Sequence, residues 1–106
     1  MKQGDIVLVQ FPFSNLAEKK LRPAVVLSNE HYNRYANVLL AGIFSKQHPF
    51  SVPITNADMQ KRRLVKASYV GLENMFSIEK TLIRHTIDAL TSEKRKTVLT
   101  EARKCF

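Results

Sequence analysis

Short runs of aliphatic and β-branched residues, each closed by turn residues, constrain the fold of this 106-residue chain most. Such runs occupy residues 5–11, 24–28, 37–45 and 50–54, and the segment 64–78 predicts two more short strands around residues 72–74. Short strands joined by turns, with no helices between them, predict a small antiparallel barrel or a compact sheet.

Proline and glycine refine this pattern. Pro23 is expected to begin the second strand, because proline is not tolerated inside a central strand, and Pro53 moves the fourth strand toward an edge of the sheet. Gly42 predicts a bulge or a close backbone approach within the third strand. Residues 12–21 and 55–63 are polar and predict loops, while residues 78–90 fit either a short helix or a strand with a turn.

The end of the chain has a helical pattern. Thr91 or Ser92 is a suitable N-cap, and apolar residues then recur at helical spacing, namely Val98, Leu99, Ala102 and Phe106. The sequence thus predicts five to six strands followed by one amphipathic helix, in a single domain over residues 1–106.

The balance of charge points to a polyanionic partner. Seventeen Lys and Arg residues stand against nine Asp and Glu residues, for a net charge of +8. Nucleic acid is the first candidate, an acidic protein the second and a membrane surface the third, while solubility alone is the simpler explanation. No apolar run is long enough to span a bilayer, and the polar start MKQGD is not typical of a secretory signal.

Cysteine and histidine usage argues against metal and disulfides. Cys105 has no second cysteine with which to form a bridge, which favours a cytoplasmic location. No Cys/His spacing suits zinc, so we expect no metal and no cofactor.

Two residues stand out as candidates for chemistry. Pro23 restricts Arg22 to an extended backbone, and a guanidinium suits bidentate binding of phosphate oxygens. Ser45 closes the most apolar run and is followed by Lys46 and, three residues on, by His48. Taken alone, Arg22 could simply end a loop in solvent, and Ser45 could be a turn serine that bonds its own backbone.

Further charged residues are open to two interpretations. Glu18 could be a general base or a surface acid that pairs with a cation. The basic cluster Lys61, Arg62, Arg63 and Lys66 could be a solvated face or could contact a nucleic-acid backbone. His31 lies beside an acid, Glu30, and His85 lies three residues before Asp88, but both pairings are expected to be surface or structural.

Three stretches together resemble a known family. GDIVLVQFPFS at residues 4–14, RPAVVLS at residues 22–28 and a third strand that ends in Ser45 are similar to the MazF/PemK (Kid) toxins of type II toxin–antitoxin systems. The likeness covers most of the chain, and after Ser51 it is one of pattern only.

The resemblance implies a mainly β fold with a C-terminal α-helix, an SH3-like small β-barrel of the kind shared by CcdB, MazF and Kid. It implies a homodimer that cuts single-stranded RNA without metal, leaves 2′,3′-cyclic phosphate and 5′-hydroxyl ends, and so inhibits translation and growth. It also implies an antitoxin partner whose acidic, disordered tail fills the RNA groove, and no membrane association.

The family's site residues transfer one by one. Its arginine before the proline corresponds to Arg22, its hydroxyl at the end of the third strand to Ser45, and an acid of the first loop to Glu18. The histidine that some members carry in that loop is missing, and Lys66 and Ser68 stand where another branch has an arginine–aspartate pair.

Arg22 would therefore stabilise phosphoryl charge, Ser45 would hydrogen-bond the same phosphate, and Glu18 is favoured over His48 as the base. RNA would also be bound by Lys19, Lys20, Lys46 and His48, with the cluster at residues 61–66 as a further contact. Three aromatic residues either stack on bases or serve as core or dimer contacts: Phe13, Tyr32 and Tyr35.

Two alternatives remain. One is a non-catalytic toxin of the same fold that binds DNA gyrase, which would not need Arg22 and Ser45 at an RNA groove. The other is a degenerate member that binds RNA or antitoxin without cutting.

Overall fold

The computed structural model describes residues 1–10 and 21–106 of the chain. Within these residues lie six strands: β1 (Asp5–Gln10), β2 (Leu21–Val26), β3 (Asn37–Phe44), β4 (Ser51–Ile54), β5 (Ser68–Glu79) and β6 (Ile83–Ala89). The same part of the chain holds three short 3-10 helices, η1 (Tyr32–Arg34), η2 (Asn56–Asp58) and η3 (Lys80–Leu82), and one α-helix, α1 (Ser92–Arg103).

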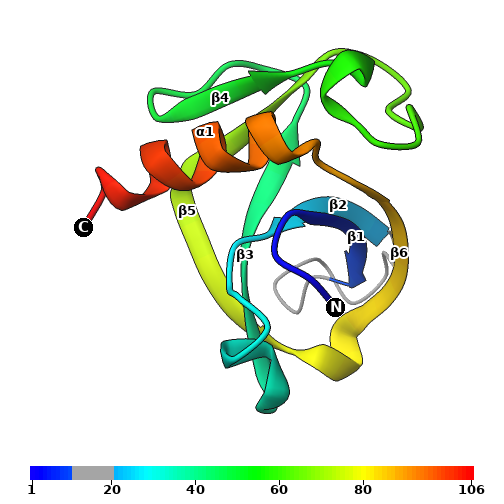
Figure 1. Cartoon of the computed structure of the whole chain (residues 1–106), viewed down its shortest axis with the longest axis vertical. Coiled ribbons are helices and arrows are strands. Elements are labelled where there is room, and N and C mark those ends of the chain that lie inside the picture. Colours follow the sequence, from blue (N-terminus) through cyan, green and yellow to red (C-terminus); the bar gives the residue numbers. More distant parts are fainter. Residues whose placement is uncertain (11–20) are drawn as a thin grey trace.

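The described strands form one antiparallel sheet in the order β4-β5-β3-β2-β1-β6. The sheet curls so that β1, β2 and β6 enclose one end of the molecule, while α1 crosses over β5 (Figure 1). β4 and β6 stay at the two edges, so the barrel is not closed by strand pairing. The predicted fold class, mainly β with a C-terminal helix in a barrel-like sheet, is confirmed.

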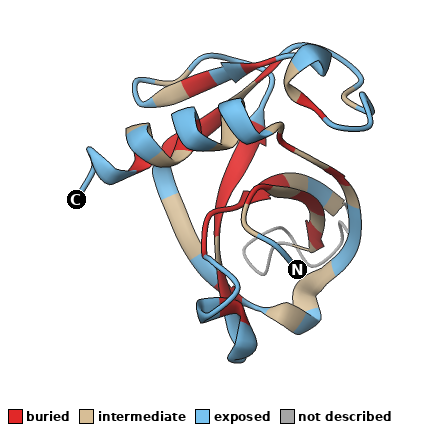
Figure 2. Ribbon diagram, viewed as in Figure 1, coloured by how far each residue is buried: buried red, intermediate tan, exposed pale blue. Residues whose placement is uncertain are grey.

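Side chains from the two faces of the sheet build two apolar clusters. Strand alternation sends Ile6 and Val25 into one cluster, which α1 completes with Val98 and Ala102. The intervening strand residues Val7, Val9, Ala24 and Val26 enter the second cluster, which lies inside the curled part of the sheet. Buried residues therefore follow one another along β2 and β3 (Figure 2).

The segment 64–78 departs from the prediction of two short strands. It forms one continuous twelve-residue strand, β5, which pairs with β4 over residues 68–71 and with β3 over residues 69–70 and 75–79. The break expected near residue 72 is instead a change of register between Ala41 and Ile43 of β3. Only Gly42 lies between these two residues on β3, whereas residues 71–74 lie between their partners on β5. The bulge is therefore in β5, opposite Gly42 and not at Gly42 itself, and it lets one long strand bend where two were expected.

Pro23 also departs from the prediction, because it lies inside β2, and β2 is flanked by two strands. The pairing registers explain this tolerance. Pro23 lies opposite Leu8 of β1, but pairing with β3 begins only at the next residue, Ala24. The strand is an edge at this point, so the missing N–H of proline costs no ladder hydrogen bond to β3. Leu21, expected in the preceding loop, starts β2.

The remaining expectations can be compared directly. Residues 78–90, left open between helix and strand, contain the end of β5, η3 and the strand β6. The helix starts at Ser92 as predicted, and Thr91 caps it by accepting a hydrogen bond from the N–H of Lys94 at 3.3 Å. Phe106 was expected on the buried helix face, but it lies beyond the last helical residue and is 84% exposed.

Two other findings concern the predicted loops and the length of the helices. The loop predicted at residues 12–21 lies outside the described residues except for Leu21, and the loop at 55–63 includes the single-turn η2. Among the described residues, no helix is long and apolar enough to cross a membrane.

Candidate functional site

The candidate site lies at the end of the sheet where β2 begins and β3 ends. Ala24 pairs with Gly42 in this antiparallel ladder, so residues two positions farther out on each strand, Arg22 and Phe44, lie on the same face. Arg22 is exposed and lies opposite Val9 of β1. Among the described residues, its guanidinium has no hydrogen-bond or ion-pair partner.

The ring of Phe44 packs over two glycines of neighbouring strands. A Cβ atom built on Gly42 would lie 2.8 Å from Cζ of Phe44, and one built on Gly71 would lie 2.7 Å from its Cε2. Both distances are shorter than real Cβ contacts, so the ring occupies space that any other residue at these positions would fill. The close backbone approach predicted at Gly42 is thus an approach by an aromatic ring.

His48 rests on this ring. The ring centroids of Phe44 and His48 are 4.7 Å apart, and Nδ1 of His48 lies 2.8 Å from Oε1 of Glu73 on β5. Ser51 fixes the turn, because its hydroxyl accepts from the N–H of His48 and donates to its carbonyl. The side chains of His48 and Glu73 are 34% and 31% exposed, so the pair is open to a ligand.

We call Arg22, Phe44, His48 and Glu73 the rim cluster. Its members come from β2, the end of β3, the following turn and β5, and its two charged side chains and its imidazole all reach solvent. The arrangement offers a fixed cation for an anionic ligand and an imidazole that is held by a carboxylate.

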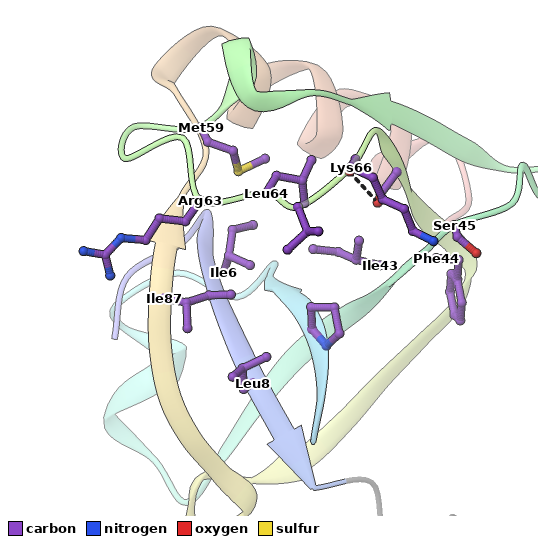
Figure 3. A pocket seen from close by; sticks show the side chains of 13 residues that line it. Ile6, Leu8, Ile43, Phe44, Ser45, Met59, Arg63, Leu64, Lys66 and Ile87 are labelled. Carbon is purple, nitrogen blue, oxygen red and sulfur yellow. Dashed lines mark hydrogen bonds between the residues drawn. The ribbon is translucent and has the colours of Figure 1, made fainter. Parts of the chain in front are cut away.

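An apolar pocket of about 300 Å³ lies on the other face of the same sheet end (Figure 3). Its floor is aliphatic, with Ile6, Leu8, Ile43 and Ile87 among the lining residues. Phe44, which also belongs to the rim cluster, lies at one edge with Ser45 and Lys66, and the guanidinium of Arg63 points away at the other.

The structure places the two predicted phosphate ligands on neighbouring strands but not on one face. Ser45 lines the pocket together with Pro23, whereas strand alternation directs Arg22 to the opposite side of Pro23. The Ser45 hydroxyl has no hydrogen-bond partner among the described residues, so the structure gives no support to the alternative of a turn serine.

The basic residues Lys61 to Arg63 are held by a buried carboxylate. Asp88, 4% exposed at the end of β6, accepts hydrogen bonds from the backbone N–H of Lys61 at 2.8 Å and of Arg63 at 2.9 Å. Arg62 between them has a positive φ of 54°, which turns both N–H groups toward the same anion. Asp88 therefore has a structural role, which is to hold this loop against the end of β6.

The pKa of Asp88 follows from these contacts. Burial by itself would raise the pKa of this carboxyl. The backbone N–H groups of Arg63, Lys61 and Ala89, together with the charge of Arg63, outweigh burial and lower the pKa below the ordinary value of an aspartate.

The other predicted residues are placed as follows. Lys46 is exposed beside Ser45, and the side chains of Lys61, Arg62, Arg63 and Lys66 are all exposed. Tyr32 and Tyr35 are exposed too, but they follow the end of β2 opposite to Arg22, so the structure does not bring them to the rim cluster. Four candidates lie outside the described residues: Phe13, Glu18, Lys19 and Lys20.

Sequence reasoning missed Glu73 and Phe44. Glu73 is 25 positions from its imidazole partner and carries no local signal, although an acid inside an otherwise apolar strand pattern is a departure that could have been noticed. Phe44 was read as part of an apolar strand. Within the described part of the chain, no group of three or more His, Cys, Asp or Glu side chains could hold a metal ion.

Comparison with known proteins identifies the family. The model of the PemK-like, MazF-like toxins of type II toxin–antitoxin systems matches residues 2–106. An endoribonuclease MazF of Staphylococcus saprophyticus is 26% identical over 102 residues, which cover 92% of this chain and 84% of that protein.

Solved structures agree on the fold. The Mycobacterium tuberculosis toxin MazF-mt6 superposes with a TM-score of 0.71 at 23% identity, over 92% of this chain and 90% of that one. The MazE–MazF complex of Deinococcus radiodurans gives a TM-score of 0.76 at 19% identity, over 99% and 93% of the two chains. Together with the GDIVLVQF and RPAVVLS motifs, these matches establish that the chain belongs to the PemK-like, MazF-like toxins of type II toxin–antitoxin systems.

Proposed function

We propose that this chain is the toxin of a type II toxin–antitoxin system and acts as a metal-independent, sequence-specific endoribonuclease on single-stranded RNA. The products would be 2′,3′-cyclic phosphate and 5′-hydroxyl ends, and cleavage of mRNA would inhibit translation and growth. The observation that carries the proposal is the exposed guanidinium of Arg22 at the open end of β2, which follows from the Arg–Pro step and has no partner among residues 1–10 and 21–106. The family match and the relative named endoribonuclease support it.

The chemistry requires three contributions. The 2′-hydroxyl of the substrate loses its proton and attacks the phosphorus, the phosphoryl group gains charge, and the 5′ oxygen leaves. Arg22 suits the second role, because a fixed cation stabilises charge where it develops. Guanidinium holds its proton too tightly to serve as the acid. Ser45 adds a hydrogen bond from the pocket side, and Glu18 and His48 are the candidates for the base.

Several cations are suited to binding the RNA backbone. Lys46 follows Ser45 directly, Lys66 lies at the same edge of the pocket as Ser45, and Arg63 lies at the opposite edge. Lys19 and Lys20 precede Arg22 in the sequence. Affinity that depends on such contacts falls as the salt concentration rises.

The partner is proposed to be an acidic antitoxin, and the active form a homodimer in the cytoplasm. A net charge of +8 favours binding of an acidic chain. The MazE–MazF complex from Deinococcus radiodurans and a mycobacterial endoribonuclease solved with its cognate antitoxin are structural neighbours that support this partner.

The test is cleavage of a long RNA by the purified protein, with and without EDTA, followed by mapping of the ends. We expect cleavage in both conditions and a loss on the order of a hundredfold or more in Arg22→Ala. Arg34→Ala is the matched control, because Arg34 is exposed in η1 at the opposite end of β2 and β3. An Arg22→Ala variant as fast as wild type would reject this site, and absence of cleavage by wild type would favour a toxin that binds gyrase.

A further inference from the structure

We propose that Glu73 and His48 form a carboxylate–imidazole pair in which His48 accepts the proton of the substrate's 2′-hydroxyl. His48 is the catalytic residue of the pair, and Glu73 is its positioning residue. This inference rests on the proposed ribonuclease function. It assigns the base to a pair that lies on the face of Arg22.

The contact between the two side chains selects the form of the imidazole. Nδ1 of His48 lies 2.8 Å from Oε1 of Glu73, a distance typical of an N–H donor and a carboxylate. A neutral imidazole that donates through Nδ1 has its lone pair on Nε2. The carboxylate therefore leaves Nε2 as the acceptor, and it stabilises the imidazolium that forms when Nε2 takes a proton.

The position of the pair follows from the strand register. Arg22 and Phe44 lie on one face, two positions beyond Ala24 and Gly42, the last paired residues of β2 and β3. His48 packs against Phe44 with ring centroids 4.7 Å apart, and Glu73 projects from β5 two residues after Gly71, whose Cα lies under the same ring. The imidazole is thus held against the ring of Phe44, and Arg22 comes from the same end of the sheet.

Stability alone is a poor explanation for this construction. An ion pair with about a third of each side chain exposed contributes little to stability, because solvent screens it. Glycine weakens a strand interior, yet two strands carry one beneath Phe44. Ser51 makes two hydrogen bonds to the backbone of His48, which holds the turn in place. Together these features fix the direction of the His48 imidazole, although its contacts contribute little to the stability of the fold.

The step balances without a further reactant. Nε2 of His48 takes the proton as the 2′ oxygen bonds to phosphorus, and the bond from phosphorus to the 5′ oxygen breaks with its electron pair on that oxygen. The leaving oxygen takes a proton from solvent, which reaches the exposed rim, and the imidazolium returns its proton to water. Arg22 carries the charge of the phosphoryl group in between.

The experiment compares His48→Ala, Glu73→Gln and the control His85→Ala in single-turnover cleavage of one RNA. His85 is exposed on β6, and its variant should cut as fast as wild type. We expect His48→Ala to lose about 10²- to 10⁴-fold in kcat with little change in KM. Added imidazole should restore part of that rate. Glu73→Gln should lose on the order of tenfold or more in kcat, because the wrong ring form is then populated.

The outcomes separate the two proposals. If wild type leaves RNA intact, both the ribonuclease function and this pair are rejected. If wild type cuts RNA and His48→Ala cuts equally fast, only the pair is rejected. A folded His48→Ala that loses binding rather than kcat, or that imidazole does not rescue, also rejects it. The pair is also rejected if Glu18→Gln abolishes cleavage while His48→Ala does not.

Discussion

Glu73 and Asp88 are both carboxylates beside basic groups, but they differ in burial and in the partners that hold them. The Asp88 carboxylate is buried and accepts hydrogen bonds from three backbone N–H groups, those of Lys61, Arg63 and Ala89. The Glu73 carboxylate is about a third exposed, and its partner within the described part of the chain is the imidazole of His48.

The difference in burial and in partners distinguishes a carboxylate with a structural role, Asp88, from one suited to a catalytic site, Glu73. A buried anion satisfied by backbone donors fixes a loop, and a substrate cannot reach it. A half-exposed anion that holds one nitrogen of an imidazole leaves the other nitrogen free for a ligand. We therefore expect changes at Asp88 to lower stability, and changes around Glu73 to lower activity more than stability.

The largest effect on stability is expected for Asp88→Asn. The amide keeps one acceptor oxygen but turns an NH₂ group toward an N–H donor, so at least one hydrogen bond to a charged acceptor is lost and one donor is left unpaired. The expected loss in the free energy of unfolding is about 3 kcal/mol, measured by urea denaturation. Glu30→Gln, at an exposed position, is the control and should change it by less than about 0.5 kcal/mol. If Asp88→Asn and wild type had equal free energies of unfolding, the structural role of Asp88 would be rejected.

The pH dependence of wild type gives a second measure of the same carboxylate. The pKa of Asp88 is lower in the folded state, so the unfolded state binds a proton first as pH falls. Its stabilising contribution is complete above the ordinary aspartate pKa and declines as pH falls through the lowered one. Unfolding at pH values from 7 down to 2 should show this loss in wild type. The acid-induced loss should be smaller in Asp88→Asn.

Thr91→Ala provides a further test of the comparison, because it removes the N-cap of α1 and leaves every charged group in place. Thr91 accepts from the N–H of Lys94, and removal of such a cap costs about 1 kcal/mol. Thr91→Ser should keep most of that stability, because it retains the hydroxyl. RNA cleavage by Thr91→Ala should equal that of wild type below the melting temperature; a large loss of cleavage would contradict the division between the two regions.

Gly71→Ala should show the reverse, a small loss of stability with a clear loss of activity. The new Cβ would lie 2.7 Å from Cε2 of Phe44, and the ring, 36% exposed, can swing outward at a cost of about 1 kcal/mol or less. That movement removes the support of His48. A double-mutant cycle with Phe44→Ala provides the control, since Gly71→Ala should be close to neutral once the ring is absent.

Sequence reasoning identified the elements well where the signal was local. Thr91 as the cap, Pro53 at an edge strand and the family motifs are all confirmed, whereas the bulge predicted at Gly42 lies opposite it, in β5. It failed for Pro23 and for the continuity of β5, because both depend on where the neighbouring strand begins to pair. Arg22 and Ser45 were found from the motif, but local sequence contained nothing about the faces they occupy.

The sequence by itself determined the strand content, the terminal helix, the basic character and the family of this protein, since these follow from composition, periodicity and short motifs. Only the tertiary structure decided that Glu73 meets His48 and that Asp88 meets Lys61, 25 and 27 positions apart in the chain. Such pairings are fixed by the registers of β3, β5 and β6 within the curled sheet, and a register is set by the packing of all its strands together.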